Sequence, residues 1–333
     1  MIEPPIVSAA PIDCSELLQS IRMRNLIAVT GTGFSCFVSD DPLIQGYHVA
    51  TWPGLLEHGF QYCIANGLHG SDSTHDVRVQ LDEKRPRQLI GAAQTILQWL
   101  DAPSSSRRQQ WLAGSVGQLE LKRHEVVRRL KLLSPGAIIT LNYDDLIEQG
   151  TKYPPLDWTE HDLIARVLRK DADPHVIHLH GYWRKAENVI ADFFSYRDIT
   201  KDPATRALMI DLFIYRRLLF VGCRGTFEDP HFKQVMSDIS QSGTGYSHVH
   251  YVLCRTCDLN DMRGLLETTG MFRPLVYGES YDDLARFLST LAKNAGVDLE
   301  GDALASSAIG VPRQERGLNV RRAAEIWKLQ ANE

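Results

Sequence analysis

The stretch NLIAVTGTGFSCF, residues 25–37, joins an apolar run directly to two glycines that flank a threonine. The run is nearly continuously apolar, which is typical of a strand covered on both faces. A structural turn needs only one glycine, so Gly31 and Gly33 predict a backbone that comes close to another group. A strand that ends in such a turn and leads into a helix can hold an anion with its backbone N–H groups and the helix N-terminus.

The dinucleotide-binding fingerprint around this turn is incomplete. Its third glycine would fall at position 36, which is Cys36. The acidic residue expected about twenty positions further on has only Glu57 as a rough counterpart. Taken alone, the turn therefore leaves two interpretations open, a phosphate-binding loop and an ordinary tight connection between a strand and a helix.

Further apolar runs alternate with segments of helical spacing. Four of the runs predict strands, namely AIITLN (137–142), HVIHLHG (175–181), RLLFVG (217–222) and HVHYVLC (248–254). Apolar positions recur at helical spacing in 87–100, 117–133, 205–215 and 281–293. This alternation predicts an α/β fold with a Rossmann-like, doubly wound parallel sheet.

The spacing of the runs predicts the domain organisation. Far more residues separate the first strand from AIITLN than an ordinary crossover needs, so we expect a helical insertion module between them. The expected parts are an N-terminal leader (1–20), a Rossmann-like core (21–44 and 131–298), a helical insertion (45–130) and a C-terminal tail with a short helix (299–333).

Bulk properties exclude several classes of protein. The 333 residues carry a formal net charge of -5, which argues against direct nucleic-acid binding as the main purpose. The N-terminus does not resemble a signal peptide, and no apolar run reaches membrane-spanning length. We therefore expect a cytoplasmic protein with no membrane association. The six scattered cysteines indicate reduced thiols rather than a disulfide framework.

Polar residues follow the apolar run in ITLNYDDLIE, residues 139–148. Open α/β sheets bind ligands at the carboxyl ends of their strands. We expect either Asp144 or Asp145 to cap the following helix. Asn142 at the strand end is harder to explain structurally, because a buried amide must find a partner.

Two histidines share one face of the strand predicted in HVIHLHG. His180 is at the carboxyl end of the run, whereas His178 lies deeper and is interpreted as a satisfied core histidine. A metal site is the rival interpretation, with His175, Asp144 and Asp229 as further ligands. These residues show no helical His-Glu spacing, so we expect no metal.

Four segments, in the order AVTGTGFS, TLNYDDLIE, IHLHGYW and LLFVGCRGTFEDPHF, resemble the sirtuin-like fold. They are most similar to the bacterial NAD-hydrolysing (NADase) branch used in anti-phage defence. TWPGLLEHG (51–59) also resembles the segment that follows the glycine loop in that branch. The resemblance implies an NAD+ glycohydrolase that cleaves NAD to nicotinamide and ADP-ribose and depletes NAD in abortive infection.

The resemblance also implies residue roles. NAD would be the substrate, and its pyrophosphate would be held by the loop of Gly31, Thr32, Gly33, Phe34 and Ser35. Asn142 and Asp144 would contact the nicotinamide ribose and carboxamide, and His180 would be the base that acts on the ribose or on water. Gly222 would lie near the adenosine ribose.

The sequence departs from deacetylating sirtuins at three places. No cysteine occurs in 182–216, where those enzymes carry the two Cys-x-x-Cys pairs of a zinc ribbon. Their Thr-Gln-Asn is replaced by Thr140-Leu141-Asn142, and their small adenosine-site residues by Cys223 and Arg224. The first two changes argue against protein deacylation, and the third alters the adenosine site.

Control by another polypeptide is expected, because the tail is too short for a separate sensor domain. We expect a homo-oligomer and a separate sensor or activator, for which the resemblance suggests a ring-forming ATPase or a nuclease-like protein. The basic run at 121–131 is interpreted as a solvated helix face rather than a partner contact. Alternatives to the enzyme are a non-catalytic sensor subunit that binds NAD or ADP-ribose and a metal-dependent hydrolase.

Overall fold

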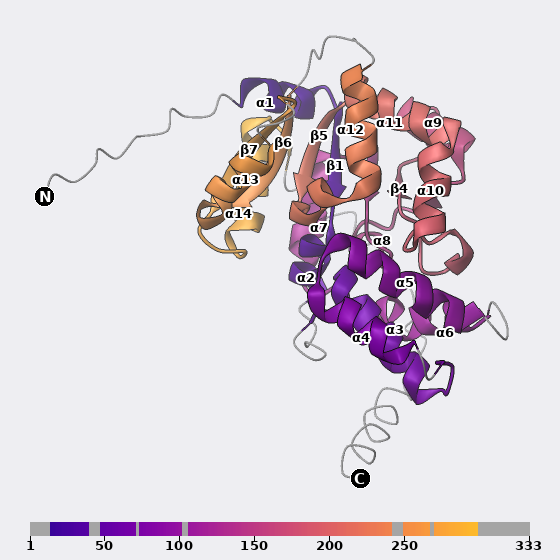
Figure 1. Cartoon of the computed structure of the whole chain (residues 1–333). Helices are drawn as coiled ribbons and strands as arrows, with labels where there is room; N and C mark the ends of the chain where they lie inside the picture. The colour runs from indigo at the N-terminus through magenta and orange to yellow at the C-terminus, as the bar shows by residue number, and fades with distance from the viewer. Residues whose placement is uncertain are drawn as a thin grey trace, which may run out of the picture. The chain divides into compact units, whose positions relative to one another are not determined.

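The computed structural model describes residues 14–39, 47–70, 73–101, 106–241, 249–266 and 270–298. Within these residues, seven parallel strands form one sheet in the order β3-β4-β2-β1-β5-β6-β7 (Figure 1). The strands are β1 (Leu26–Thr30), β2 (Ala137–Thr140), β3 (Pro155–Asp157), β4 (His175–His178), β5 (Arg217–Val221), β6 (His250–Arg255) and β7 (Phe272–Gly278).

The strand order is that of a doubly wound sheet. On one side of β1 the chain adds β2, then the edge strand β3, and then β4 between them. It then crosses back to add β5, β6 and β7 on the other side. The order therefore reverses between β1 and β5, where open α/β sheets form their ligand crevice. The predicted Rossmann-like fold is confirmed, and each of the five predicted strands is present.

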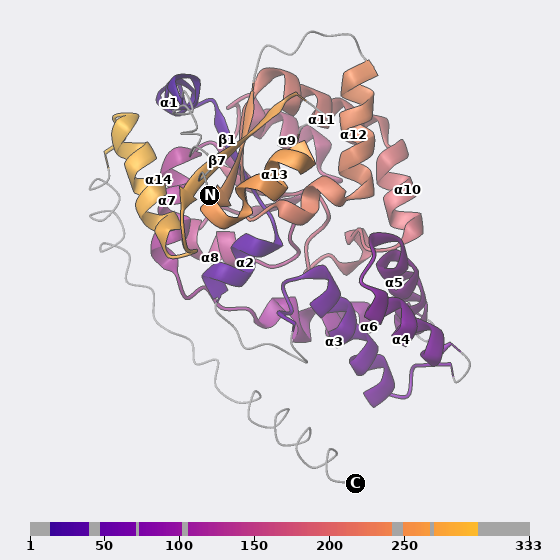
Figure 2. The same ribbon diagram turned by 60° about the vertical axis from the view of Figure 1, so that its left-hand side comes forward.

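Helices cover both faces of the sheet (Figure 2). One face carries α1 (Ser15–Arg22), α7 (His124–Leu133), α8 (Leu146–Thr151) and α14 (Asp283–Asn294). The other carries α9 (His161–Leu168), α11 (Pro203–Tyr215), α12 (Pro230–Gln241) and α13 (Leu259–Leu266), with α10 (Phe193–Lys201) beside α11 and α12. Short 3-10 turns are η1 (Val116–Gln118), η2 (Ala186–Asn188), η3 (Arg224–Glu228) and η4 (Thr256–Asp258).

Alternate residues of the central strands build the core on the second face. Ile27 and Val29 of β1 and Leu218 and Phe220 of β5 are buried there against α9, α11, α12 and α13. Phe220 belongs to a cluster of phenylalanine rings, in which its centroid lies 5.6 Å from that of Phe272. Burial of this surface fixes the sheet and hence the strand ends that carry the polar residues.

In the described part of the predicted insertion, a group of helices lies together at the carboxyl end of the strands (Figures 1 and 2). They are α3 (Trp52–Ala65), α4 (Thr74–Glu83), α5 (Pro86–Asp101) and α6 (Ser106–Gly114). α7, which the predicted boundary at residue 130 divides, packs against β1, α8 and α14. The exact domain boundaries therefore stay a prediction.

The predicted helix over 117–133 is only partly correct. α7 accounts for its second half, but η1 and an irregular segment replace the first half. Gly117 packs against the Trp183 ring, and Leu119 and Leu121 are both buried, a spacing that one helical face does not give. The predicted helices at 87–100, 205–215 and 281–293 correspond to α5, α11 and α14.

Parts of the predicted leader and tail lie outside the described residues, including the helix expected near 320–330. Residues 15–20 of the leader are helical, in α1. Among the described residues, none of the helices has the length and apolar character needed to cross a membrane.

Candidate functional site

The two glycine-containing turns after β1 and β5 lie against each other. The Gly31 N–H donates to the Val221 carbonyl oxygen at 3.1 Å, and the Gly33 N–H donates to that of Gly222 at 3.0 Å. A Cβ on Gly31 would lie 2.7 Å from the Gly222 carbonyl oxygen. Gly222 has φ +68°, and a Cβ there would lie 2.1 Å from the Phe34 nitrogen. The close approach that the glycines permit is thus between two turns of this chain.

The remaining residues of the first turn have different positions. Thr32 begins α2 (Thr32–Ser39) and lines both cavities described below. Phe34 is buried and lines only the second cavity, whereas Ser35 is buried beneath the turn and lines neither. Because the Gly31 and Gly33 amides already have carbonyl partners, Thr32 at the start of α2 is the residue best placed to meet an anion.

Asn142 connects β2 to the glycine turn. Its Nδ2 donates to the Gly31 carbonyl oxygen at 2.9 Å and to Ser35 Oγ at 2.6 Å. A carbonyl oxygen only accepts, so the NH2 group must face Gly31 and the orientation of the amide is fixed. Asn142 Oδ1 is buried and has no hydrogen-bond partner among the described residues. The side chain thus lines the first cavity and keeps one acceptor without a partner.

His180 lies two residues beyond the end of β4 and lines the same cavity. Its ring is 6.0 Å, centroid to centroid, from that of Tyr196, whose hydroxyl donates to Asp229 Oδ2 at 2.7 Å. Burial lowers the pKa of His180 below its ordinary value, and the negative charge of Asp229 offsets part of this effect. The imidazole is therefore neutral at neutral pH and can accept a proton.

Asp144 lies behind the residues that line the first cavity. Its Oδ1 accepts from the Leu146 N–H at 3.2 Å. Asp145 is the N-cap residue of α8, but its side chain makes no capping hydrogen bond, so the Asp144 carboxylate bonds the first amide of the helix instead. Asp144 Oδ2 has no hydrogen-bond partner in the described part of the chain, and the residue lines neither cavity. Burial raises the pKa of Asp144 to about 6.

Glu57, the rough counterpart of the fingerprint's acidic residue, is committed to the helical module. It lies in α3 and accepts two hydrogen bonds from Arg78 of α4, at 2.8 and 2.9 Å. Such a bidentate pair joins the two helices and leaves Glu57 outside the lining of either cavity.

His178 is fully buried, as expected for a core histidine. Its Nδ1 lies 3.0 Å from the Asn142 carbonyl oxygen and its Nε2 lies 2.6 Å from Glu148 Oε1. Both ring nitrogens are therefore engaged, and His178 and His180 do not form a ligand pair. In the described residues, no group of three or more histidine, cysteine or acidic side chains is arranged to hold a metal ion.

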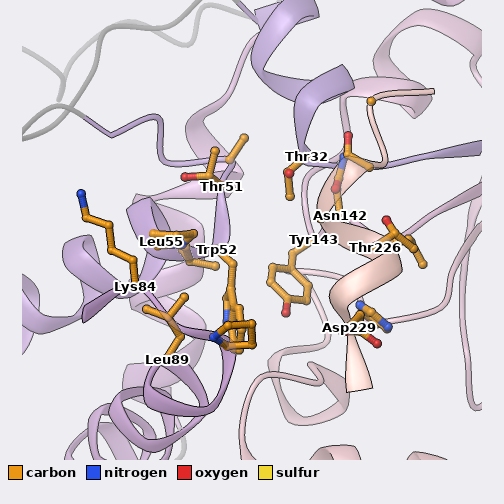
Figure 3. A pocket seen from close by; sticks show the side chains of 18 of the residues that line it. Thr32, Thr51, Trp52, Leu55, Lys84, Leu89, Asn142, Tyr143, Thr226 and Asp229 are labelled. Atoms are coloured by element: carbon orange, nitrogen blue, oxygen red, sulfur yellow. The ribbon is translucent and has the colours of Figure 1, made fainter. Parts of the chain in front are cut away.

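The first cavity, of about 270 Å³, opens between the strand ends and the helical module. Figure 3 shows the labelled side chains on two opposing sides, with Thr32, Asn142, Tyr143, Thr226 and Asp229 on one and Thr51, Trp52, Leu55, Lys84 and Leu89 on the other. Residues from the switch point thus meet residues of α3 and α5 across the space where a ligand would bind.

A second cavity, of about 210 Å³, lies on the β6 side of the two turns. Its lining includes Gly33, Cys223, Arg255, Tyr277 and Tyr281, and it shares Thr32, Gly222 and Gly225 with the first cavity. Arg255 is held by two hydrogen bonds to Asp258 and lies over the Tyr281 ring at 4.2 Å. The glycine turns therefore separate two adjoining spaces, which suits a ligand with two ends.

Sequence reasoning did not assign Trp52, Tyr143 or Tyr196 to the site, although all three line the first cavity. Trp52 follows the N-cap Thr51 of α3, and its buried Nε1 has no hydrogen-bond partner within the described chain. The Thr-Trp-Pro sequence signals a helix start, but nothing local signals that this start faces a cavity. Tyr196 of α10 gives no signal either, because tertiary contacts with Trp52, His180 and Asp229 place it in the site.

The fold and these cavities define a Rossmann-like protein with a candidate ligand site at the switch point of its sheet. The family model of the SIR2-like domain matches residues 136–271. This part of the chain is therefore similar to a SIR2-like domain, which supports an NAD-related function in general. The match includes Asn142, His180, Gly222 and Asp229 and begins after the glycine turn at 31–35.

Proposed function

We propose that this protein is an NAD+ glycohydrolase that cleaves NAD to nicotinamide and ADP-ribose. The observation that carries the proposal is the convergence of three strand ends on one cavity. Asn142 after β2 donates to the turn after β1, and His180 after β4 lines the same space. The nicotinamide ribose would occupy the first cavity, the pyrophosphate would cross the turns near Thr32, and the adenosine would occupy the second cavity.

Cleavage of the N-glycosidic bond of NAD requires few catalytic groups from the protein. The ring nitrogen of nicotinamide is formally cationic, so it leaves readily as the N-glycosidic bond breaks. The sugar passes through an oxocarbenium-like state, as in other glycoside cleavages. The site must hold the ribose and place a water molecule beneath its anomeric carbon.

Asn142 and His180 would have different roles in this reaction. Asn142 offers the buried Oδ1 acceptor to a ribose hydroxyl or to the attacking water. His180 is held in its neutral form by burial, which lowers its pKa, so it can take the proton released when water attacks. Asp144, which lines neither cavity, would act through Asn142 and α8 rather than by direct contact.

In the cell, we propose that this activity depletes NAD as part of an anti-phage defence system. Free hydrolysis of NAD would kill the host, so activity would await a partner protein or self-assembly. The resemblance of the sequence to the defence-associated branch supports this step. A non-catalytic sensor would use the same cavities but release no nicotinamide.

The experiment measures nicotinamide release from NAD by the purified full chain, alone and with the products of neighbouring genes. His180→Ala and Asn142→Ala are expected to lower kcat by roughly a hundredfold or more, because each removes a group that acts in the chemical step. His175→Gln is the matched control, since His175 begins the same strand at its opposite end and should leave turnover unchanged.

The outcomes separate the alternatives. Wild-type turnover in His180→Ala would contradict the assigned base. Tight binding of NAD without nicotinamide release, in every combination of neighbouring proteins, would favour the sensor. Loss of activity on metal chelation, with recovery on metal addition, would favour the hydrolase that depends on a metal.

A further inference from the structure

A buried ion pair lies directly behind Asn142. Glu148 of α8 and His178 of β4 meet at 2.6 Å, with the His178 side chain fully buried and that of Glu148 11% exposed. The Tyr182 ring covers the imidazole, with centroids 4.6 Å apart. None of these three residues lines either cavity, so the pair has no direct contact with a ligand.

The hydrogen-bond partners of His178 determine which of its ring nitrogens carries a proton. The Asn142 carbonyl oxygen only accepts, so His178 Nδ1 must carry a proton and donate to it. The second ring nitrogen then shares one proton with Glu148 Oε1. Although burial alone would lower it, the pKa of His178 is raised by the Glu148 carboxylate and by the Asn142 carbonyl, with Asp144 adding to the effect.

The backbone N–H and the side-chain Nδ2 of Asn142 also make hydrogen bonds, whereas Oδ1 makes none within the described residues. Its backbone N–H donates to Thr140 Oγ1 at 3.2 Å, and its Nδ2 donates to Gly31 and Ser35. The backbone carbonyl oxygen is the remaining polar group of Asn142, and it accepts a hydrogen bond from His178 Nδ1. A turn residue whose peptide group lost that donor could rotate and carry Oδ1 away from the cavity wall.

We propose that the His178–Glu148 pair is a positioning device for Asn142. Glu148 fixes the imidazole, and the imidazole Nδ1–H holds the Asn142 carbonyl so that the side-chain amide keeps its orientation. The effect on turnover rests on the proposed function, whereas the effect on the Asn142 amide does not.

The test compares variants that keep and remove the Nδ1–H donor. Removing His178 alone would leave the Glu148 carboxylate buried without a partner, which is strongly destabilising. The double variant His178→Phe with Glu148→Leu replaces both groups by apolar side chains, which is often neutral for stability. Glu148→Gln is the conservative variant, because its NH2 group can donate to Nε2 and leave the Nδ1–H donor in place.

Two readouts are measured on the full chain. The first is the side-chain amide signal of Asn142 in protein labelled with 15N-asparagine, assigned by its loss in Asn142→Ala. The second is nicotinamide release, separated into kcat and KM. In the double variant we expect the Asn142 amide to shift and to exchange faster with solvent. We also expect kcat to fall by roughly tenfold or more with KM changed by less than about threefold.

In contrast to the double variant, Glu148→Gln should show the wild-type Asn142 amide signal and keep most of the wild-type kcat. An unchanged Asn142 signal in a folded double variant would overturn the proposal, as would a shifted signal with unchanged kcat. Should the wild-type chain release no nicotinamide under any condition, the proposed function would fail, while the amide signal alone would still decide whether the pair positions Asn142.

Discussion

Replacing Asp144 by asparagine is expected to stabilise the protein, and the gain should grow with pH. Burial raises the pKa of this carboxyl group from 3.8 to about 6 in the folded protein. The folded state therefore binds the proton more tightly than the unfolded state. The stability that the neutral form contributes is complete below pH 3.8 and is lost as pH rises through about 6.

The magnitude follows from the shift. About two pKa units at roughly 1.36 kcal/mol each correspond to about 3 kcal/mol of unfolding free energy at about pH 8. At about pH 5 the unfolded state is ionised and the folded state largely protonated, so about half of that difference remains. Asparagine cannot ionise, and its Oδ1 can still accept from the Leu146 N–H. The gain of the variant over wild type should approach these values as an upper limit.

Urea denaturation of both proteins at about pH 8 and about pH 5 measures the difference. Asp145→Asn is the matched control, because Asp145 is the adjacent carboxylate but pairs with Arg184 at 3.3 Å and accepts from Gln149 at 2.8 Å. It should bring no gain at the higher pH. Equal destabilisation of Asp144→Asn at both pH values would refute the reasoning, since it would show that the carboxylate is not penalised by burial.

Three further outcomes are expected. Because burial lowers the pKa of His180, the acid limb of the pH–rate profile should lie below the ordinary histidine value of 6.5. Asp229→Asn should move that limb to still lower pH, and an unmoved limb would remove His180 as the base. Gly222→Ala should cost at least about 2 kcal/mol in thermal denaturation, because its Cβ would meet backbone 2.1 Å away. Gly225→Ala, which meets nothing within 4 Å, should cost less than about 1 kcal/mol, and equal losses would contradict the steric argument. Trp52→Phe should weaken NAD binding in calorimetry by about fivefold if its unpartnered Nε1–H donates to the ligand, and unchanged affinity would show that it does not.

The central strands could be predicted because burial on both faces leaves a clear apolar signal. The two edge strands could not. β3 is only three residues long and begins at Pro155, and β7 contains Pro274 and ends at Gly278. Proline is tolerated at sheet edges because an edge N–H needs no ladder partner, but it weakens any prediction of a strand from sequence.

The polar stretch near residues 73–83 hides a helix for a similar reason. α4 buries only Val77 and Leu81 and is fixed to α3 by the Arg78–Glu57 pair. A long-range ion pair leaves no local pattern, so tertiary contacts rather than periodicity determine this element.

The strand-end residues of the site could be predicted because parallel strands bring their carboxyl ends to one edge. Asn142 and His180 share the first cavity as that rule requires. The position of Asp144 behind the wall depends on how the turn after β2 enters α8, which the sequence does not specify. Trp52 and Tyr196 come from helices whose approach to the sheet depends on the packing of the helical module.

The most direct measurement is a crystal structure of the full chain with an NAD analogue whose nicotinamide ribose is carbocyclic and cannot form the oxocarbenium ion. We predict that its nicotinamide ribose contacts Asn142 and His180 in the first cavity, with the adenosine beyond Gly222 in the second cavity. An analogue bound with its nicotinamide ribose away from both residues would contradict the assignment of this site.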